Sequence, residues 1–155
     1  MAEVQTVYTD SIAKGYAGMV ANGELSNRIS RTCEPAGGIG FGVPCYRGTG
    51  DRGCTDTVGT LATFLGWSIA HQALGLTAGQ TADEYAQYET VAILPLGAIY
   101  IHVTGAVTDS APITVGAGAG IADLYGATAA DATHIATGWI ADETVTDGIC
   151  RIVRR

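Results

Sequence analysis

The sequence predicts an all-β fold, a single-domain β-sandwich or jelly-roll-like barrel, on three observations. Its 22 glycines have no regular period and are interspersed with Thr, Val, Ile and Ala, a composition typical of short strands and tight turns. Several segments alternate large apolar residues with small or polar ones, as strands do. Only residues 60–73 approach a helical period of 3.6, and there the β-branched residues and Gly66 favour a strand.

Residues 1–36 have neither period, and we predict that most of this range is an extended N-terminal arm before a β domain at residues 37–155. A terminal arm is ordered only when something ties it down. Tyr and Met are enriched at protein interfaces, which favours docking on a neighbouring protein. The candidate contact residues in the arm are Tyr8, Ile12, Tyr16, Met19 and Val20.

The first strand signals of the β domain lie in residues 39–45, where large residues alternate with glycines and a proline. One face of this strand is nearly bare and invites close backbone approach. Residues 48–53 are rich in turn residues. Residues 65–70 alternate again, and the stripe that contains Trp67 is expected to face the core. Residues 75–90 are polar and irregular, which predicts a surface loop or one short helical turn.

Residues 99–103 form the most convincing strand of the chain, because two isoleucines and a valine alternate with Tyr100 and His102. A shorter strand is predicted at residues 91–94, and a turn at residues 95–97 separates the two.

Two hairpins are predicted in the last third of the chain. An Asp-Ser pair carries turn chemistry between residues 105–108 and 113–115, and residues 116–120 predict a flexible loop. A Thr-Asp-Gly turn joins residues 139–140 to a final strand at residues 149–153. The total of about seven short strands favours a sandwich, barrel or jelly roll.

The net charge of −7 is distributed unevenly. Residues 1–31 hold three acids and three bases, whereas residues 32–150 hold twelve acids and two bases. An acidic body repels phosphate backbones, so we expect no nucleic acid partner. The last five residues contain three arginines, of which Arg154 and Arg155 are candidate contacts with an acidic partner. The alternative is a solvated, solubilising tail.

No segment resembles a signal peptide and no run of about 18 apolar residues exists, so we expect neither secretion nor membrane insertion. Synthesis in the cytoplasm follows, where thiols stay reduced. The four cysteines have neither C-x-x-C nor zinc-like spacing, which predicts free, mostly buried thiols. They are Cys33, Cys45, Cys54 and Cys150.

Two segments approach catalytic or nucleotide-binding motifs without the required context. Residues 48–53 match G-x-G-x-x-G, but poor helix formers follow and no βαβ alternation exists, so a surface turn is expected. Ser68 lies in a sequence close to G-x-S-x-G, and Asp109 and His134 follow it in hydrolase order. Ser68 belongs to an alternating strand, however, and not to a strand-to-helix elbow. We therefore expect no enzyme and no cofactor.

We expect no metal site. The three histidines His71, His102 and His134 could in principle meet at zinc, but nothing in their spacing supports this. The acidic pairs at 83–84 and 142–143 lack calcium-loop spacing and are interpreted as solvated loop charges.

Residues 41–48, Phe-Gly-Val-Pro-Cys-Tyr-Arg-Gly, resemble the phage structural cement (capsid decoration) protein family. The order and spacing of further similar segments extend the resemblance over most of residues 16–153. These segments are residues 18–21, 64–70, 89–93, 97–107 and 150–153.

The resemblance implies a decoration protein on the outer surface of an icosahedral phage head, made in the host cytoplasm, that bridges major capsid proteins and stabilises the expanded shell. The composition agrees, because 47% of the residues are hydrophobic and only 15% are charged, against about 25% charged in ordinary domains. Such a chain is expected to cover surface by contact with a partner. Symmetric shells also favour a homo-oligomer, a dimer or trimer.

The alternative is a carbohydrate- or surface-binding β module, such as an adhesin or fibre component. That function needs exposed aromatic rings as a stacking platform. The cement interpretation instead predicts that Trp67 and Trp139 are largely buried.

Overall fold

The computed structural model describes residues 14–21, 26–71, 83–117 and 125–155, and these ranges contain strands and no helix. The predicted all-β class is confirmed. Accordingly, no helix in the described part is long and apolar enough to span a membrane. The strands are β1 (Asn27–Cys33), β2 (Ile39–Gly40), β3 (Pro44–Arg47), β4 (Gly53–Thr55), β5 (Phe64–Ser68), β6 (Glu84–Tyr85), β7 (Thr90–Val103), β8 (Pro112–Gly116), β9 (Tyr125–Gly126), β10 (His134–Ala141) and β11 (Gly148–Arg154).

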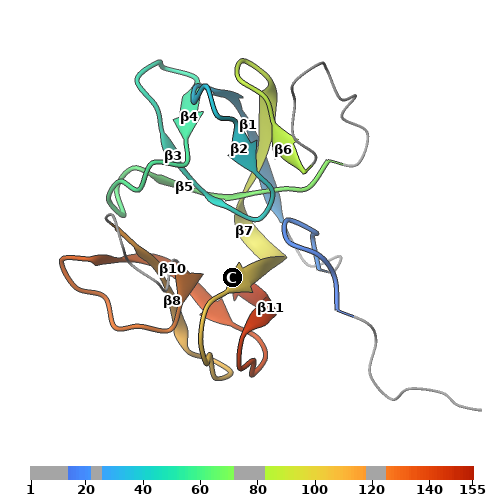
Figure 1. The fold of residues 1–155 in the computed structure, drawn as a ribbon, viewed down its shortest axis with the longest axis vertical. Coiled ribbons are helices and arrows are strands. Elements are labelled where there is room, and N and C mark those ends of the chain that lie inside the picture. Colours follow the sequence, from blue (N-terminus) through green and yellow to red (C-terminus); the bar gives the residue numbers. More distant parts are fainter. Residues whose placement is uncertain (1–13, 22–25, 72–82, 118–124) are drawn as a thin grey trace, which may run out of the picture.

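Five strands close into a small ring, the first barrel, in the upper half of Figure 1. Strand β1 pairs with β4 in parallel and with β7 in antiparallel orientation, and the order β4, β3, β5, β7 completes the ring. The short β2–β6 pair adds Ile39 and Tyr85 to its interior. Closure leaves these five strands with few unpaired edges.

Strand β7 then continues into a second sheet of order β7-β11-β10-β8-β9, in the lower half of Figure 1. This sheet curls back on itself, because the Thr104 N–H donates to the carbonyl of Tyr125 at 2.9 Å. It encloses the second core, an apolar cluster that includes Ile101 and Trp139. The barrel-like core is thus confirmed, while the finer sandwich or jelly-roll topology stays a prediction.

The turn predicted at residues 95–97 is wrong, because β7 runs through it without interruption. The strand changes partners here: Leu94 pairs with β5, and Gly97 pairs with Arg154 of β11. Pro95 lies between the two sets of partners, where its missing N–H interrupts neither ladder. Gly97 has a φ of 125°, a conformation that glycine adopts at low cost and that redirects the strand.

Two other expected elements differ in the structure. The strand predicted at residues 39–45 is split by a turn at Gly42, whose φ is 69°. The hairpin predicted between residues 105–108 and 113–115 is wrong, since Val107 bridges to Val145 and β8 pairs with β9 and β10. In both places the local turn chemistry was present, but long-range partners determined the pairing.

Strand β1 lies inside the range that was assigned to the arm. Its alternation places Cys33 in the core of the first barrel and Ile29 against that core. The structure therefore puts Asn27–Cys33 in the sheet, which leaves a shorter range for an arm than residues 1–36.

All four cysteines are free and buried, which confirms the prediction. Cys33, Cys45 and Cys54 lie together in the core of the first barrel, and Cys150 lies in the second core. Burial raises the pKa of Cys33 to about 12 and that of Cys150 to about 11. These thiols therefore behave as small apolar side chains.

The titration of Asp131 tests whether the turn before β10 forms. The backbone N–H of Thr133 donates to the Asp131 carboxylate at 2.7 Å and its hydroxyl at 2.8 Å, and these bonds lower the pKa of Asp131 to about 2. Because the unfolded pKa is about 3.9, the stabilising effect of Asp131 is present above that pH and is lost as the pH falls through about 2. A carboxyl NMR titration should find this low midpoint. An ordinary midpoint would show that the turn does not form.

Candidate functional site: the outer face of the second sheet

The N-terminal segment, residues 14–21, lies along an edge of β7 as a short additional strand. The Tyr100 N–H donates to the carbonyl of Met19 at 2.9 Å, and Val20 forms an antiparallel bridge with Ile99. An uncovered edge of β7 would expose unpaired backbone groups to other chains. The segment therefore completes the second sheet from the amino-terminal end of the chain.

Glycine at position 18 lets this segment approach the body of the protein. Gly18 has a φ of 83°, and a Cβ atom there would lie 2.8 Å from the Ala70 nitrogen and 2.9 Å from the Gly42 nitrogen. Its carbonyl accepts the Ala70 N–H at 2.8 Å. Backbone atoms cannot move aside as a flexible side chain can, so only glycine fits here.

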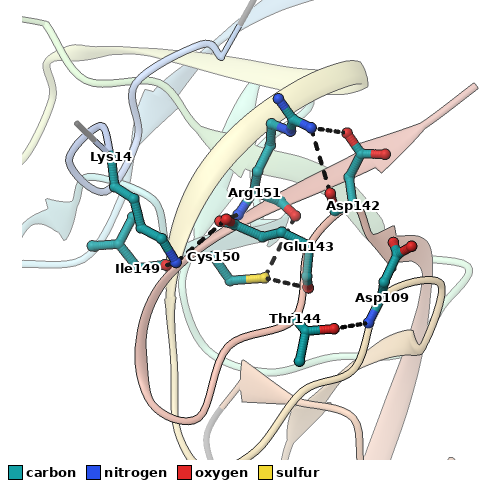
Figure 2. Close-up of polar contacts among 8 residues, drawn as sticks. All are labelled: Lys14, Asp109, Asp142, Glu143, Thr144, Ile149, Cys150 and Arg151. Atoms are coloured by element: carbon teal, nitrogen blue, oxygen red, sulfur yellow. Dashed lines mark hydrogen bonds and ion pairs between the residues drawn. The ribbon is translucent and has the colours of Figure 1, made fainter. Parts of the chain in front are cut away.

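Lys14 binds the start of the segment to the β10–β11 loop and to β11 (Figure 2). The Lys14 ammonium lies 3.3 Å from the Glu143 carboxylate and donates to the Ile149 carbonyl at 3.2 Å. Glu143 also accepts the Arg151 backbone N–H at 2.7 Å. Both charged side chains are partly exposed, so the pair contributes at most about 1 kcal/mol. The backbone bonds to β7 hold the segment more strongly.

The loop between β10 and β11 is fastened by several polar contacts (Figure 2). The Arg151 guanidinium lies 2.8 Å from the Asp142 carboxylate, and Arg155 lies 3.9 Å from the same carboxylate. The Thr144 hydroxyl accepts the Asp109 N–H at 3.0 Å. This network fixes the C-terminal strand against its neighbour, so Arg151 serves inside the subunit.

Side chains alternate across this part of the sheet. The register of β7 and β11 aligns one cross-strand row that faces the second core: Val20, Ile99 and Ile152. The next row points to the opposite side: Met19, Tyr100 and Arg151. Because neighbouring residues in a strand point to opposite faces, the second row belongs to a surface that we call the outer face.

Exposed apolar side chains lie at the two edges of the outer face, and Ala98 and Val153 between them are buried. Five large apolar side chains are exposed in the described residues, and three of them lie here: Tyr16 (45%), Met19 (37%) and Ile140 (41%). Ile140 pairs with Val153 of β11, three strands away from Met19 and thus roughly 14 Å across the sheet. The outer face therefore comprises Tyr16, Met19, Tyr100, Ile140 and Arg151.

The structure separates the predicted contact residues. Tyr16 and Met19 lie on the outer face, whereas Val20 is partly buried against the second core, and its role as a contact stays a prediction. The Arg154 guanidinium lies beside Gly138 of β10, and Arg155 reaches Asp142. Two predicted contacts, Tyr8 and Ile12, lie outside the described residues.

Sequence reasoning missed Ile140 as a surface residue. Its neighbours Trp139 and Ala141 are buried, so the alternation of a strand already required Ile140 to point outward. That signal was available, but residues 139–140 were interpreted only as the lead into the final hairpin.

The G-x-G-x-x-G loop at residues 48–53 binds an acidic group of the chain itself. The Glu34 carboxylate accepts the N–H groups of Thr49 and Gly50, each at 2.8 Å, and the Thr49 hydroxyl at 3.0 Å. The Thr49 N–H bond is the main cause of the lowered pKa of Glu34. Backbone N–H groups that could cradle a phosphate are thus used internally, and the predicted turn is confirmed.

Ser68 is a buried structural residue. Its hydroxyl donates to the Gly40 carbonyl at 2.6 Å and accepts the Val43 N–H at 2.9 Å, and no part of Ser68 is exposed. A nucleophile must reach a substrate. In the described ranges, no three His, Cys, Asp or Glu side chains come together as a possible metal site.

The fold resembles that of a solved phage capsid chain. It matches a chain of "The capsid of Myoviridae Phage XM1" with a TM-score of 0.68 and 13% sequence identity, covering 99% of this chain and 97% of that one. The fold thus places the protein in a class of all-β proteins with a barrel-like core. Residues 4–155 match the family described as structural cement protein (E217 gp24/Pam3 gp6), and the chain belongs to this family of phage structural proteins. No curated protein matches the sequence.

Proposed function

We propose that the protein is a decoration subunit on the exterior of a phage head that bridges neighbouring major capsid proteins and stabilises the expanded shell. The observation that carries the proposal is the outer face, where Tyr16 and Met19 are exposed in the segment beside β7 and Ile140 is exposed on β10. Exposed apolar groups that gather on a soluble domain mark contact surfaces. Family membership supplies the class of partner, a phage capsid.

Stabilisation of the expanded shell follows from thermodynamic linkage between subunit binding and the state of the shell. A subunit that binds only the expanded shell lowers the free energy of that state by an amount that rises with its concentration. The contact is preorganised, since the N-terminal segment is already paired with β7 and little backbone entropy is lost on binding. The acidic body, with twelve acids and two bases in residues 32–150, suits a position away from the packaged DNA.

The same proposal covers the remaining expectations. The subunit acts without catalysis, cofactor or metal, is made in the host cytoplasm, and self-associates. The carbohydrate-binding alternative receives no support from the tryptophans, because Trp67 and Trp139 are fully buried. A stacking platform requires exposed rings.

Replacing Tyr16 and Met19 together by serine should weaken binding to expanded shells that lack the protein. Loss of two partly exposed anchors is expected to cost tenfold or more in affinity, about 1.4 kcal/mol or more. Binding is measured by co-sedimentation with the shells, and the shell melting temperature is followed in parallel. Deletion of residues 1–20 would also remove Val20 from the second core, so the double substitution is the cleaner test.

The matched control is Leu61→Ser, which removes an apolar side chain that is 54% exposed in the β4–β5 connection. This variant should bind and stabilise shells as the unmodified protein does. Equal binding by the Tyr16/Met19 variant would show that the outer face is not the contact. Failure of the unmodified protein to bind any shell would overturn the proposed function itself.

A further inference from the structure

The ring of the first barrel is closed by a short joint between β1 and β4, which we call the seam. The two strands pair at two positions, Thr32 with Gly53 and Cys33 with Cys54. On its other side, β1 pairs with β7 at five positions. Among the described strands the seam is the one parallel pairing, and parallel pairs are slightly less stable per residue than antiparallel pairs. The seam is therefore a place where the ring opens readily.

One of the two seam pairs consists of two cysteines. Paired residues on neighbouring strands have Cα atoms about 4.8 Å apart, and a disulfide requires a Cα separation of about 4.4 to 6.8 Å. Cys33 and Cys54 are register partners, and both side chains belong to the apolar cluster of the first barrel. The backbone thus holds the two cysteines at a separation that a disulfide can span.

The two thiols of this pair differ in reactivity. The Cys45 thiol donates a hydrogen bond to the sulfur of Cys54, and this bond is the main cause of the lowered pKa of Cys54. Burial instead raises the pKa of Cys33 to about 12. Because the thiolate is the form that reacts with oxidants, Cys54 is expected to be oxidised first.

The position of Cys54 in the chain gives a small oxidant a route to its buried sulfur. Cys54 lies in the middle of the three-residue strand β4, two residues after the exposed Arg52. Cys150 is equally buried, but it lies in β11, which pairs with β7 at seven positions. Local opening is easiest where few pairs hold a strand. An oxidant should therefore reach Cys54 before Cys150.

We propose that hydrogen peroxide converts Cys33 and Cys54 into a disulfide that locks the seam of the first barrel. The Cys54 thiolate attacks one peroxide oxygen, the O–O bond breaks, and a sulfenic acid forms as hydroxide leaves. The hydroxide takes up the proton that Cys54 had released. The Cys33 sulfur then attacks the Cys54 sulfur, the S–O bond breaks, and the hydroxyl group leaves with the Cys33 proton as water. Two thiols are oxidised, and one peroxide is reduced to two molecules of water.

The lock forms only in oxidising surroundings. A reducing cytoplasm keeps the thiols free. The high pKa of Cys33 slows the second step, but its fixed position opposite Cys54 gives its sulfur a high effective concentration. The disulfide encloses residues 33–54 in a loop, which restricts the unfolded chain and stabilises the folded one. This inference concerns the subunit alone and does not depend on the proposed function.

Counting thiols after oxidation tests the lock. The reduced full-length chain is treated with hydrogen peroxide, unfolded and labelled with a maleimide. Mass spectrometry should find two labelled cysteines in place of the four in the untreated chain. Digestion with trypsin and chymotrypsin should give Cys33 and Cys54 in one linked product, because cleavage after Phe41 separates Cys33 from Cys45. The melting temperature should rise by about 5 °C or more and return to its first value after treatment with dithiothreitol.

Three alanine variants are the matched controls. Cys33→Ala should gain no thermal stability on oxidation. Cys150→Ala should form the disulfide at the unmodified rate, whereas Cys45→Ala should form it more slowly, since Cys54 loses the donor that favours its thiolate. Four labelled thiols after oxidation of the unmodified chain, a linkage between any other pair of its cysteines, or equal stabilisation of Cys33→Ala overturns the inference. Shell binding through the outer face is measured separately and is unaffected by these outcomes.

Discussion

Gly66→Ala is expected to destabilise the protein by roughly 2 to 5 kcal/mol, the sum of a left-handed backbone cost and overpacking. Gly66 has a φ of 139°, and an added Cβ would lie 2.3 Å from the carbonyl oxygen of Leu94 and 2.8 Å from the nitrogen of Pro95. Both are backbone atoms of β7 at the point where it leaves β5. The melting temperature should fall by about 10 °C or more, which thermal unfolding by circular dichroism measures.

Alanine substitutions at two other glycines separate the backbone cost from the cost of overpacking. Gly105 has a φ of 81° with no atom within 4 Å of an added Cβ, so Gly105→Ala should show only the backbone cost of about 1 to 2 kcal/mol. Gly37 has neither constraint, and Gly37→Ala should be neutral or slightly stabilising. If Gly66→Ala were as mild as Gly105→Ala, the close approach of β5 to β7 would be incorrect.

Trp67→Ala should cost about 3 to 5 kcal/mol, the range for removing a large buried ring. Trp67 belongs to β5 of the first barrel but packs in the second core. Its ring makes edge-to-face contacts with Phe64 and Tyr125, with ring centroids 6.1 Å and 5.6 Å apart. Loss of the ring should therefore also uncouple the two halves of the fold. Urea unfolding followed by Trp139 fluorescence and by far-UV circular dichroism should then give two non-coincident transitions.

Trp67→Phe is the matched variant. The Trp67 indole N–H is buried and has no hydrogen-bond partner in the described part, so phenylalanine loses volume but no polar contact. Its cost should be clearly smaller, about 1 to 2 kcal/mol, with a single transition retained. Equal losses for the alanine and phenylalanine variants would indicate that the indole N–H is hydrogen-bonded in the folded protein.

The likeness of the chain to the cement family was recognisable from its segments, yet the candidate site was only partly so. Tyr16 and Met19 were selected because of their residue types, and the structure places them on the outer face. Val20 was selected on the same grounds but faces the core, because an exposed arm and an added edge strand differ only in their pairing with β7. Ile140 lies on the same face as Tyr16 and Met19, but β7, β11 and β10 bring it there from a distant part of the sequence.

The sequence by itself determined the β class and the alternation of residues 99–103, because these depend on the two-residue period of a strand. Tertiary structure alone decided the path of β7. Pro95 and Gly97 have the composition of a turn, but the chain continues through them as one strand, because β1 and β5 bind one half of the strand and β11 binds the other. Hydrogen bonding to distant strands outweighed a local preference of about 1 kcal/mol, and the outer face depends on that choice.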